Sequence, residues 1–298
     1  MFYRRKIILA LLQLFDGQLD KIRLQKLLFL FAKGQVQQGG KAEYDFVPYK
    51  LGCYSYTANA DMTALVNRGF LTEDEKTFIK KDPTDYLKQL KPADLKLLQE
   101  VKAKYGKMRT TALMKHTYIN FPFYAMNSEI AENILSKEEL EKVTKAIPKG
   151  NKTVLFTIGY EGISLEEYLV RLLQNDVKVV VDVRNNPISM KYGFSKSRLK
   201  KYCASAGIDY LHIPEVGIQS EQRQKLITQG DYDKLFANYC KNTLTHTITH
   251  QTKILELLKQ HKRIALTCFE ANIDQCHRKH LAKAIENLPG FEYEVKHI

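Results

Sequence analysis

The spacing of hydrophobic positions predicts helices at the start of the chain. Apolar residues recur at helical spacing in residues 6–15, 21–33 and 57–67, and Asp20 precedes the second segment as a capping residue. Phe70 and Leu71 then begin a strand-like segment. The order helix, helix, turn, helix, strand is typical of a winged helix-turn-helix, which we expect over residues 1–90.

The next stretch, residues 91–150, has a charged and mainly helical pattern, and we expect it to form a helical connector. Ser136 and Glu139 have the spacing of a capping box at the start of one of its helices. Pro148 and Gly150 then break the pattern. We therefore place a domain boundary at about residue 150.

From residue 151 onward, short apolar runs alternate with helical stretches. The runs lie at residues 154–158, 177–183, 208–213 and 264–267, and residues 291–297 alternate as a closing strand. Strands joined by helices form parallel sheets, because the helix returns the chain to the end of the sheet where the previous strand began. The sequence therefore predicts an α/β fold over residues 151–298. We expect a mostly parallel, doubly wound, Rossmann-like domain, together with a smaller, mainly helical, winged-helix-like N-terminal domain.

The net charge of +13 favours an anionic partner such as DNA or a nucleotide. Residues 1–150 carry 25 Lys and Arg against 17 Asp and Glu, and residues 151–298 carry 21 against 16, so the first part is the more basic. The candidate nucleic-acid contacts are basic and aromatic residues: Lys50, Tyr54, Tyr56, Arg68, Lys196 and Arg198. The N-terminal domain would equally fit a small protein-interaction module, and both interpretations stay open.

The cysteine usage and the apolar runs bear on the compartment. Five cysteines without the spacing of a disulfide framework indicate a reducing environment. The apolar run near the N-terminus is interrupted by Gln13 and followed by Asp16, with no signal-peptide cleavage site. No segment reaches the roughly 20 apolar residues of a membrane span. We expect a soluble, cytoplasmic protein without a membrane partner.

Polar side chains follow the predicted strands at the points where these strands end. The candidate ligand-binding residues are Gly159, Tyr160, Glu161, Gly162, Arg184, His212, Cys276 and Arg278, and the candidate catalytic residues are Asp182, Cys268, Glu270 and His277. The carboxyl ends of parallel strands meet at one edge of the sheet, where α/β proteins bind ligands. Residues 276–278 would fill the first turn of a helix capped by Asp274, and a helix N-terminus favours anions.

Among these residues, Arg278 has the strongest argument for anion binding, because an arginine in the first turn opposes the helix dipole. We expect Asp182 or Glu270 to transfer protons and Arg184 to orient a carboxylate or phosphate. Asp182 and Arg184 could instead form an ion pair with each other. Residues 159–162 could be only a tight turn between a strand and a helix.

Cys268 has three interpretations. It could be a small buried residue, a nucleophile activated by a helix N-terminus, or a metal ligand together with Cys276 and either His277 or His280. The seven-residue gap between the two cysteines is not the spacing of a zinc knuckle, so we expect no metal site. The residues name no cofactor.

Five segments occur in order over residues 153–298: TIGYEG, VVVDVRNNP, GFSK, GIDYLHIPEVG and CFEANIDQCHR. Together they resemble the motifs of the domain-of-unknown-function family 488, which is similar to Rossmann-like α/β domains. The resemblance places ten residues at motif positions but implies no reaction: Gly159, Asp182, Arg184, Pro187, Phe194, Cys268, Glu270, Cys276, His277 and Arg278. Residues 216–218 (Val-Gly-Ile) stand where a Leu-Gly-Gly-like segment is usual.

The N-terminal half resembles the extension found on longer members of that family, and it is also similar to antitoxin-type and winged-helix regulators. Our leading hypothesis is a nucleic-acid-associated protein, with an N-terminal domain that docks on DNA. Its C-terminal domain would bind or process a nucleotide or another phosphate-bearing group. The alternatives are a non-catalytic regulator or defence-associated ligand sensor, and a cysteine-dependent transferase or hydrolase. The sequence does not indicate an oligomeric state.

Overall fold

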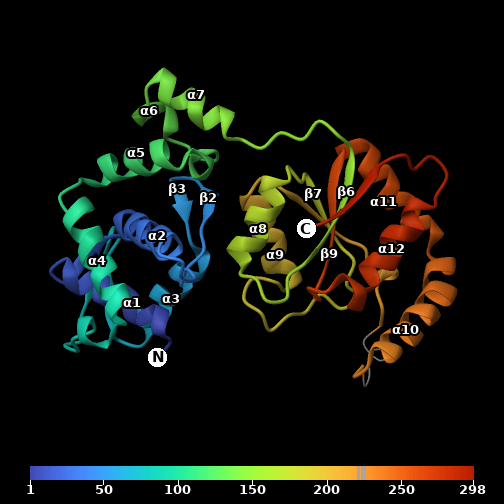
Figure 1. Cartoon of the computed structure of the whole chain (residues 1–298), viewed down its shortest axis with the longest axis horizontal. Helices are drawn as coiled ribbons and strands as arrows, with labels where there is room; N and C mark the ends of the chain where they lie inside the picture. Colours follow the sequence, from blue (N-terminus) through green and yellow to red (C-terminus); the bar gives the residue numbers. More distant parts are fainter. Residues whose placement is uncertain (220–221, 223–225) are drawn as a thin grey trace. The chain divides into compact units, whose positions relative to one another are not determined.

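The computed structural model describes residues 1–219, 222 and 226–298. The chain divides into two compact units, Met1–Ile147 and Pro148–Ile298, which are called unit 1 and unit 2 below. Figure 1 shows both units. Within the described residues, no helix combines the length and the apolar character that crossing a membrane requires.

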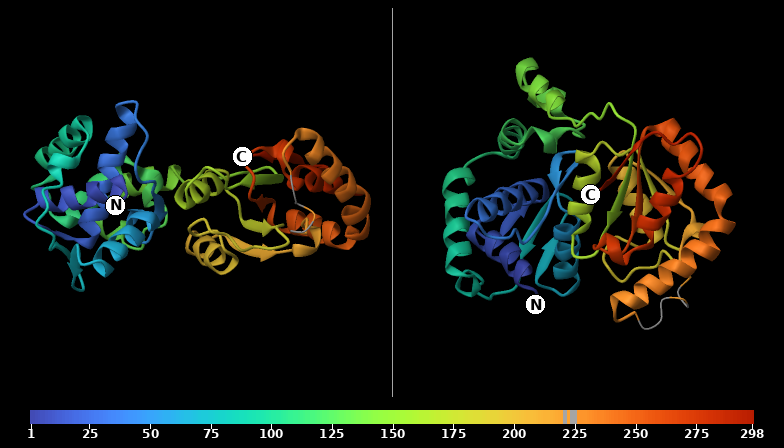
Figure 2. Two further views of the ribbon diagram at one scale, coloured as in Figure 1. Left: turned by 90° about the horizontal axis from the view of Figure 1, so that it is seen from below. Right: turned by 45° about the vertical axis from the view of Figure 1, so that its right-hand side comes forward.

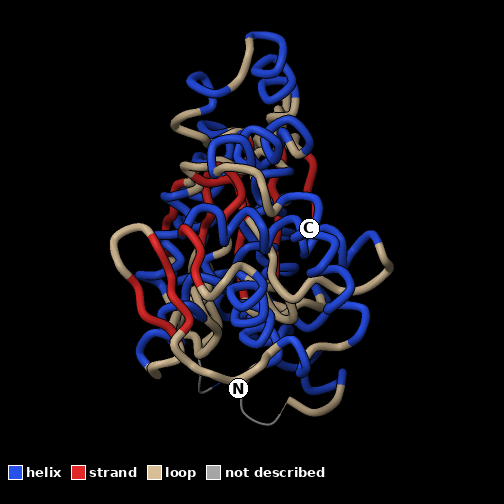
Figure 3. The backbone as a smooth tube through the Cα atoms, turned by 90° about the vertical axis from the view of Figure 1, so that its left-hand side faces the viewer, coloured by secondary structure: helices blue, strands red, loops and turns tan. Residues whose placement is uncertain are grey.

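Unit 1 begins with helices and short antiparallel strands. Its first elements are α1 (Tyr3–Leu14), β1 (Gln18–Asp20), α2 (Lys21–Gln37), β2 (Val47–Tyr49), β3 (Gly52–Tyr54), α3 (Tyr56–Asn67), β4 (Leu71–Glu73) and β5 (Thr77–Lys80). Strand β5 lies between β1 and β4 in a three-stranded antiparallel sheet, and β2 pairs with β3 in a hairpin. Figure 3 shows these short strands in red among the helices of the unit. The three predicted helices are confirmed.

The second half of unit 1 is helical. It contains α4 (Pro92–Tyr105), α5 (Thr110–Asn120), α6 (Ala131–Ile134) and α7 (Lys137–Lys145), with 3-10 turns η1 (Leu87–Gln89) and η2 (Pro122–Ala125). Helices α4 and α5 pack against α2, and Leu98 and Leu113 share a hydrophobic core with Leu24 and Leu28. Helices α4 and α5, which lie in the predicted connector of residues 91–150, therefore contribute to the hydrophobic core of unit 1.

Side-chain caps fix where helices of unit 1 begin. The carboxylate of Asp20 accepts hydrogen bonds from the backbone N–H groups of Ile22 and Arg23, both at 2.9 Å. Ser136 and Glu139 form the predicted capping box at the start of α7. These contacts are local in the sequence, which is why the residue pattern predicted them.

Unit 2 is a five-stranded parallel sheet with helices on both faces. Its elements are β6 (Val154–Gly159), α8 (Leu165–Gln174), β7 (Val179–Asp182), α9 (Lys196–Ser205), β8 (Asp209–His212), η3 (Pro214–Val216), α10 (Gln229–Asn238), the π-helix η5 (Tyr239–Leu244), α11 (Ile248–His261), β9 (Arg263–Cys268), η6 (Ile273–Gln275), α12 (His277–Glu286) and β10 (Glu294–His297). The strand order is β10-β6-β9-β7-β8, and every pair is parallel. The predicted α/β class and parallel sheet are confirmed.

The helices of unit 2 form two layers around this sheet. Helices α8 and α9 lie over one face and α10, α11 and α12 over the other, as Figures 1 and 2 show. The central strands β6, β7 and β9 are almost entirely buried, as their runs of Val, Ile and Leu require. The register pairs Gly159 with Cys268, and Asp182 with both Thr267 and His212. The carboxyl ends of β6, β9, β7 and β8 therefore meet at one edge of the sheet.

Candidate functional site at the carboxyl edge of the sheet

Asp182 and Arg184 form a buried ion pair at the end of β7. Arg184 donates from Nε to Oδ1 of Asp182 at 2.8 Å and from Nη2 to Oδ2 at 2.5 Å. The carboxylate is fully buried, and the guanidinium is 6% exposed. Burial acts to lower the pKa of Arg184, but the hydrogen bonds and charge of Asp182 outweigh it and raise this pKa. Asp182 and Arg184 therefore form the ion pair with each other that the sequence left open.

Two tyrosines and a backbone carbonyl complete this network. Nη1 of Arg184 donates to the hydroxyl oxygen of Tyr160 at 2.6 Å and to the carbonyl oxygen of Phe194 at 2.9 Å. The hydroxyl of Tyr210 donates to Oδ2 of Asp182 at 2.6 Å. Burial is the main cause that raises the pKa of Tyr160 and of Tyr210. Four hydrogen bonds therefore occupy the guanidinium of Arg184.

Tyr210 is a member of this network that the sequence analysis missed. It lies two residues before His212 on β8, so the two side chains share one face of the strand. That alternation is the signal that could have identified it. Nε2 of His212 lies 2.9 Å from the carbonyl oxygen of Arg184, and its Nδ1 lies 2.9 Å from Nζ of Lys196. His212 therefore touches the network from the edge strand.

A second network centres on the thiol of Cys268, at the end of β9. Its Sγ donates to Oε2 of Glu270 at 3.1 Å and lies 3.6 Å from Nδ1 of His277. The Sγ atoms of Cys268 and Cys276 and a ring nitrogen of His277 all lie within 4.8 Å of one another. All three residues are buried. The structure thus selects His277 over His280 as the imidazole partner of the two cysteines.

The second ring nitrogen of His277 fixes its tautomer. Nε2 lies 3.1 Å from the carbonyl oxygen of Val183, which can only accept a hydrogen bond. The proton of a neutral His277 is therefore placed on Nε2, and the lone pair of Nδ1 faces Cys268. An imidazole held in this way can accept a proton from a thiol or bind a metal ion.

Cys276 occupies the N-cap position of α12 without a side-chain capping bond, and its thiol is deeply buried. Burial is the largest of the causes that hold the pKa of Cys276 well above its ordinary value, followed by the proximity of Cys268 and Glu270. The neutral thiol is thus the stable form when no cation is nearby. Asp274, which the sequence predicted as the cap of this helix, lies instead in the 3-10 turn that precedes it. That prediction was wrong because two further residues separate Asp274 from the first helical residue.

Arg278 holds the loop that follows β9. Its Nη1 donates to the carbonyl oxygen of Glu270, and its Nη2 donates to that of Ala271 at 3.2 Å. The side chain is 2% exposed. The carbonyl oxygens at this position supply partial negative charge to an arginine in the first turn of α12. Two nitrogens of Arg278 therefore hold the loop through its carbonyl oxygens.

Residues 159–162 lie against the same loop. A Cβ atom on Gly159 would be 1.9 Å from the carbonyl oxygen of Glu270, so only glycine fits at this position. The Glu161 carboxylate accepts a hydrogen bond from the backbone N–H of Ala271 at 2.9 Å. The turn thus packs backbone against backbone at the ends of two neighbouring strands, which fits its interpretation as a tight turn.

A pocket of about 300 Å³ lies between the two networks. It is lined by Tyr160, Arg184, Asn185, Asn186, Ile188, Ser189, Met190, Ile218, Cys268 and Phe269. Ile188 and Met190 are strongly exposed, at 76% and 101%, whereas Cys268 is 1% exposed. The candidate residues that meet at this pocket are Tyr160, Arg184 and Cys268. Asn185 and Met190 were not predicted, because they lie in the loop after β7 and have no periodic pattern.

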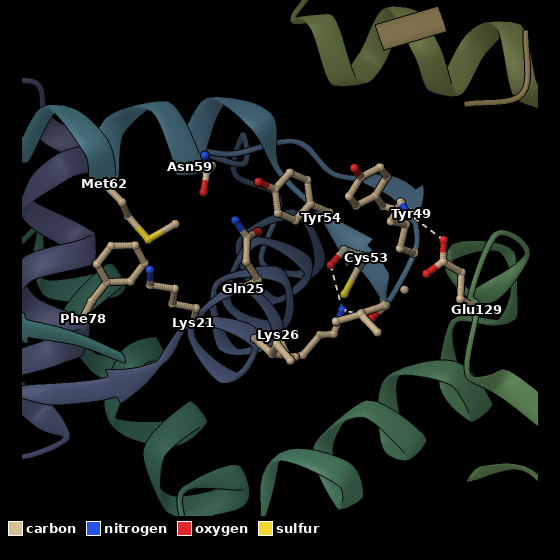
Figure 4. Close-up of a pocket in the computed structure, with 14 residues that line it drawn as sticks. Lys21, Gln25, Lys26, Tyr49, Cys53, Tyr54, Asn59, Met62, Phe78 and Glu129 are labelled. Atoms are coloured by element: carbon tan, nitrogen blue, oxygen red, sulfur yellow. Dashed lines mark hydrogen bonds and ion pairs between the residues drawn. The ribbon is translucent and has the colours of Figure 1, made fainter. Parts of the chain in front are cut away.

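The predicted nucleic-acid contacts of unit 1 lie in two places. Lys50 forms an ion pair with Glu129 at 2.9 Å, and Tyr54 and Tyr56 pack together with ring centroids 5.1 Å apart. Arg68 is exposed at the end of α3. Figure 4 shows Tyr54 at a pocket of about 400 Å³ between α2, α3 and the β2–β3 hairpin. Tyr54 and Lys50 therefore line a mainly apolar pocket, whereas Tyr56 and Arg68 are not among its lining residues.

The family comparison agrees with this description of unit 2. A model of the family described as "Domain of unknown function DUF488" matches residues 164–285. Unit 2 contains a DUF488 domain. The match includes Asp182, Arg184 and the group Cys268, Cys276 and His277, whereas Tyr160 and the whole of unit 1 lie outside it. No curated protein sequence matches this DUF488-containing chain significantly.

Proposed function

We propose that this is a DNA-associated protein in which unit 1 docks on DNA as a winged helix-turn-helix. Unit 2, a Rossmann-like domain, would bind a nucleotide or another phosphate-bearing group. The observation that carries the proposal is the order α1, β1, α2, α3, β4, β5, in which the β2–β3 hairpin is inserted between α2 and α3. Strands β1, β5 and β4 form one antiparallel sheet. Helix, strand, helix, helix and a two-stranded wing is the arrangement that winged-helix proteins use on DNA.

Helix α3 is the recognition helix in this proposal. Its exposed side chains include Asn59, Thr63 and Asn67, with Arg68 at its end. Amide and hydroxyl groups of this kind read base edges, and arginine binds phosphate. Glu73 at the end of β4 and Asp74 and Glu75 in the following turn outnumber the one basic residue there, Lys76, so phosphates would be repelled. We therefore assign DNA contact to α3 rather than to the wing.

Unit 2 offers basic residues of its own. Lys196, Arg198, Lys200 and Lys201 are all exposed on α9. The pocket at the carboxyl edge lies where parallel α/β sheets bind nucleotides and other phosphate-bearing ligands. Asn185 and Ser189 supply polar groups there, and Phe269 supplies an aromatic face. Because Arg184 and Arg278 already bind oxygen atoms of the protein, we assign ligand orientation to these uncharged groups.

Fluorescence anisotropy with a labelled DNA duplex tests the docking. We expect binding at low salt. The logarithm of the binding constant should fall linearly with the logarithm of the salt concentration, because basic side chains of the protein displace counterions from the DNA phosphates. Thr63→Glu, which puts a carboxylate on α3, should weaken binding by about tenfold or more. Thr111→Glu is the matched control, since Thr111 is exposed on α5 of the same unit.

Two outcomes would contradict the docking proposal. One is an absence of binding to DNA at low salt, and the other is an equal loss in Thr63→Glu and Thr111→Glu. For unit 2, thermal shift with a panel of nucleotides and inorganic phosphate reports ligand binding, because a ligand that binds only the folded state raises Tm. If neither inorganic phosphate nor any of the nucleotides raises Tm, the proposal that unit 2 binds a phosphate-bearing group is contradicted.

A further inference from the structure

The buried group Cys268, Cys276 and His277 contains electron-pair donors that face one another. Two thiol sulfurs and an imidazole nitrogen lie within 4.8 Å in unit 2. The Glu270 carboxylate adds an oxygen 3.1 Å from Sγ of Cys268. Polar groups that are buried together need hydrogen atoms or a cation between them. We propose that Cys268, Cys276 and His277 bind one zinc ion.

The distance between the Cys268 sulfur and the His277 nitrogen fits a tetrahedral ion. Zinc lies about 2.3 Å from cysteine sulfur and about 2.0 Å from histidine nitrogen, so two such ligands are roughly 3.5 Å apart at a tetrahedral angle. The observed separation of Sγ of Cys268 and Nδ1 of His277 is 3.6 Å. Two sulfurs and one imidazole are ligands that zinc prefers among divalent metals. A small shift of side chains would close the site around the ion.

The surroundings of His277 support this assignment. A metal-binding imidazole donates its other N–H group to a carbonyl or carboxylate, which fixes the ring and its tautomer. Nε2 of His277 has such a partner in the carbonyl oxygen of Val183, at 3.1 Å. The arrangement leaves Nδ1 as the ligand atom. This contact comes from the end of β7, so it depends on the sheet and not on the motif that contains His277.

Three protein ligands leave a fourth position on a tetrahedral ion. Zinc sites that bind a water molecule or substrate have this arrangement, whereas purely structural sites have four protein ligands. Cys268 also lines the pocket of about 300 Å³, so this position can be reached from solvent. Glu270 is half-buried beside Cys268 and is placed to bond a water at the fourth position. We therefore assign Glu270 as the neighbour of the ion and not as a ligand.

Elemental analysis of the full chain, purified without metal-affinity steps, tests the proposal. We expect one zinc ion per chain. Cys276→Ala and His277→Ala should lose the metal, while Glu270→Gln should keep it. Cys240→Ala and His280→Ala are the matched controls, because both residues lie in the same unit outside the group. Both controls should retain the zinc content of the parent chain.

Cobalt replacement gives a second measurement that does not depend on variants. Cobalt(II) in the unaltered chain should give thiolate charge-transfer absorption and the strong visible bands of a tetrahedral ion. The proposal would be overturned if the purified chain contains no metal and added cobalt(II) keeps the spectrum of the hydrated ion. A disulfide between Cys268 and Cys276 in the freshly purified chain would also overturn it. If Glu270→Gln loses its zinc, Glu270 is a ligand and the fourth position is not open. If the purified chain contains iron in place of zinc, the choice of metal is wrong. The DNA anisotropy experiment reports on unit 1 and is independent of these results.

Discussion

The guanidinium of Arg184 binds both carboxylate oxygens of Asp182, at 2.8 and 2.5 Å, inside the carboxyl edge of the sheet. Both side chains are almost completely buried. The pair is local in the sequence, because Asp182 is the last residue of β7 and Arg184 follows it by two positions. It joins three segments, because Tyr160, Phe194 and Tyr210 bond to it as well. The geometry therefore indicates a positioning role for Asp182 and Arg184.

Replacing Asp182 with Asn should destabilise the chain by about 3 kcal/mol or more, since it leaves the buried guanidinium of Arg184 without a counter-charge. Urea unfolding followed by circular dichroism measures this change. Glu286→Gln is the control, because Glu286 pairs with Lys283 on the surface, where an ion pair contributes less than about 1 kcal/mol. Similar losses in the two variants would contradict the positioning role.

Gly159→Ala should destabilise unit 2 by about 1–3 kcal/mol, because the new Cβ would overlap the carbonyl oxygen of Glu270 and force the backbone apart. The zinc content should fall as well, since Glu270 lies between Cys268 and the helix that carries the other ligands. Gly230→Ala is the control, as the nearest atom to its Cβ is a side-chain oxygen at 3.7 Å. Thermal unfolding compares the two, and an unchanged Tm in Gly159→Ala would refute the close approach.

Arg278→Lys separates two roles of this residue. If Arg278 holds the loop, the variant should lose about 1–2 kcal/mol of stability, because one ammonium group cannot replace a guanidinium that reaches two carbonyl oxygens. Inorganic phosphate should then stabilise the parent chain and the variant equally. A stabilisation by phosphate that disappears in Arg278→Lys would instead show that Arg278 binds anions.

The carboxylate of Asp61 makes the stability of unit 1 depend on pH in the acid range. Its carboxylate accepts hydrogen bonds from Nε of Arg4 at 2.5 Å, Nε of Arg5 at 2.6 Å and the hydroxyl of Tyr44 at 3.0 Å. Burial acts to raise the pKa of Asp61, but the two arginines outweigh it and hold the pKa below the ordinary 3.8. The resulting stability is present above pH 3.8 and is lost as the pH falls through the lower folded value.

Asp61→Asn should therefore lower the free energy of unfolding at neutral pH and flatten its decline below about pH 4. Urea unfolding at a series of pH values measures both effects. Glu100→Gln, on the exposed side of α4, should leave the curve nearly unchanged. A variant curve that stays parallel to that of the parent chain through the acid range would disprove the linkage.

The sequence by itself determined the elements of this protein. Helices such as α2 and α7 begin at their predicted caps, and the apolar runs became the strands of a parallel sheet. These features depend on residues close in the chain, so periodicity and capping reveal them. The motif that contains Cys268 and Arg278 also lies at the carboxyl edge of the sheet, as its position after a predicted strand indicated.

Only the tertiary structure decided which candidate residues touch. The sequence left open whether Cys268 and Cys276 lie near His277 or His280, because their approach depends on the turn between β9 and α12. The tautomer of His277 depends on Val183, 94 residues earlier in the chain. Arg278 was expected to bind an anion, and the structure adds that its Nη1 and Nη2 donate to carbonyl oxygens of the loop after β9. Side-chain partners across a sheet are set by long-range packing, which local patterns do not encode.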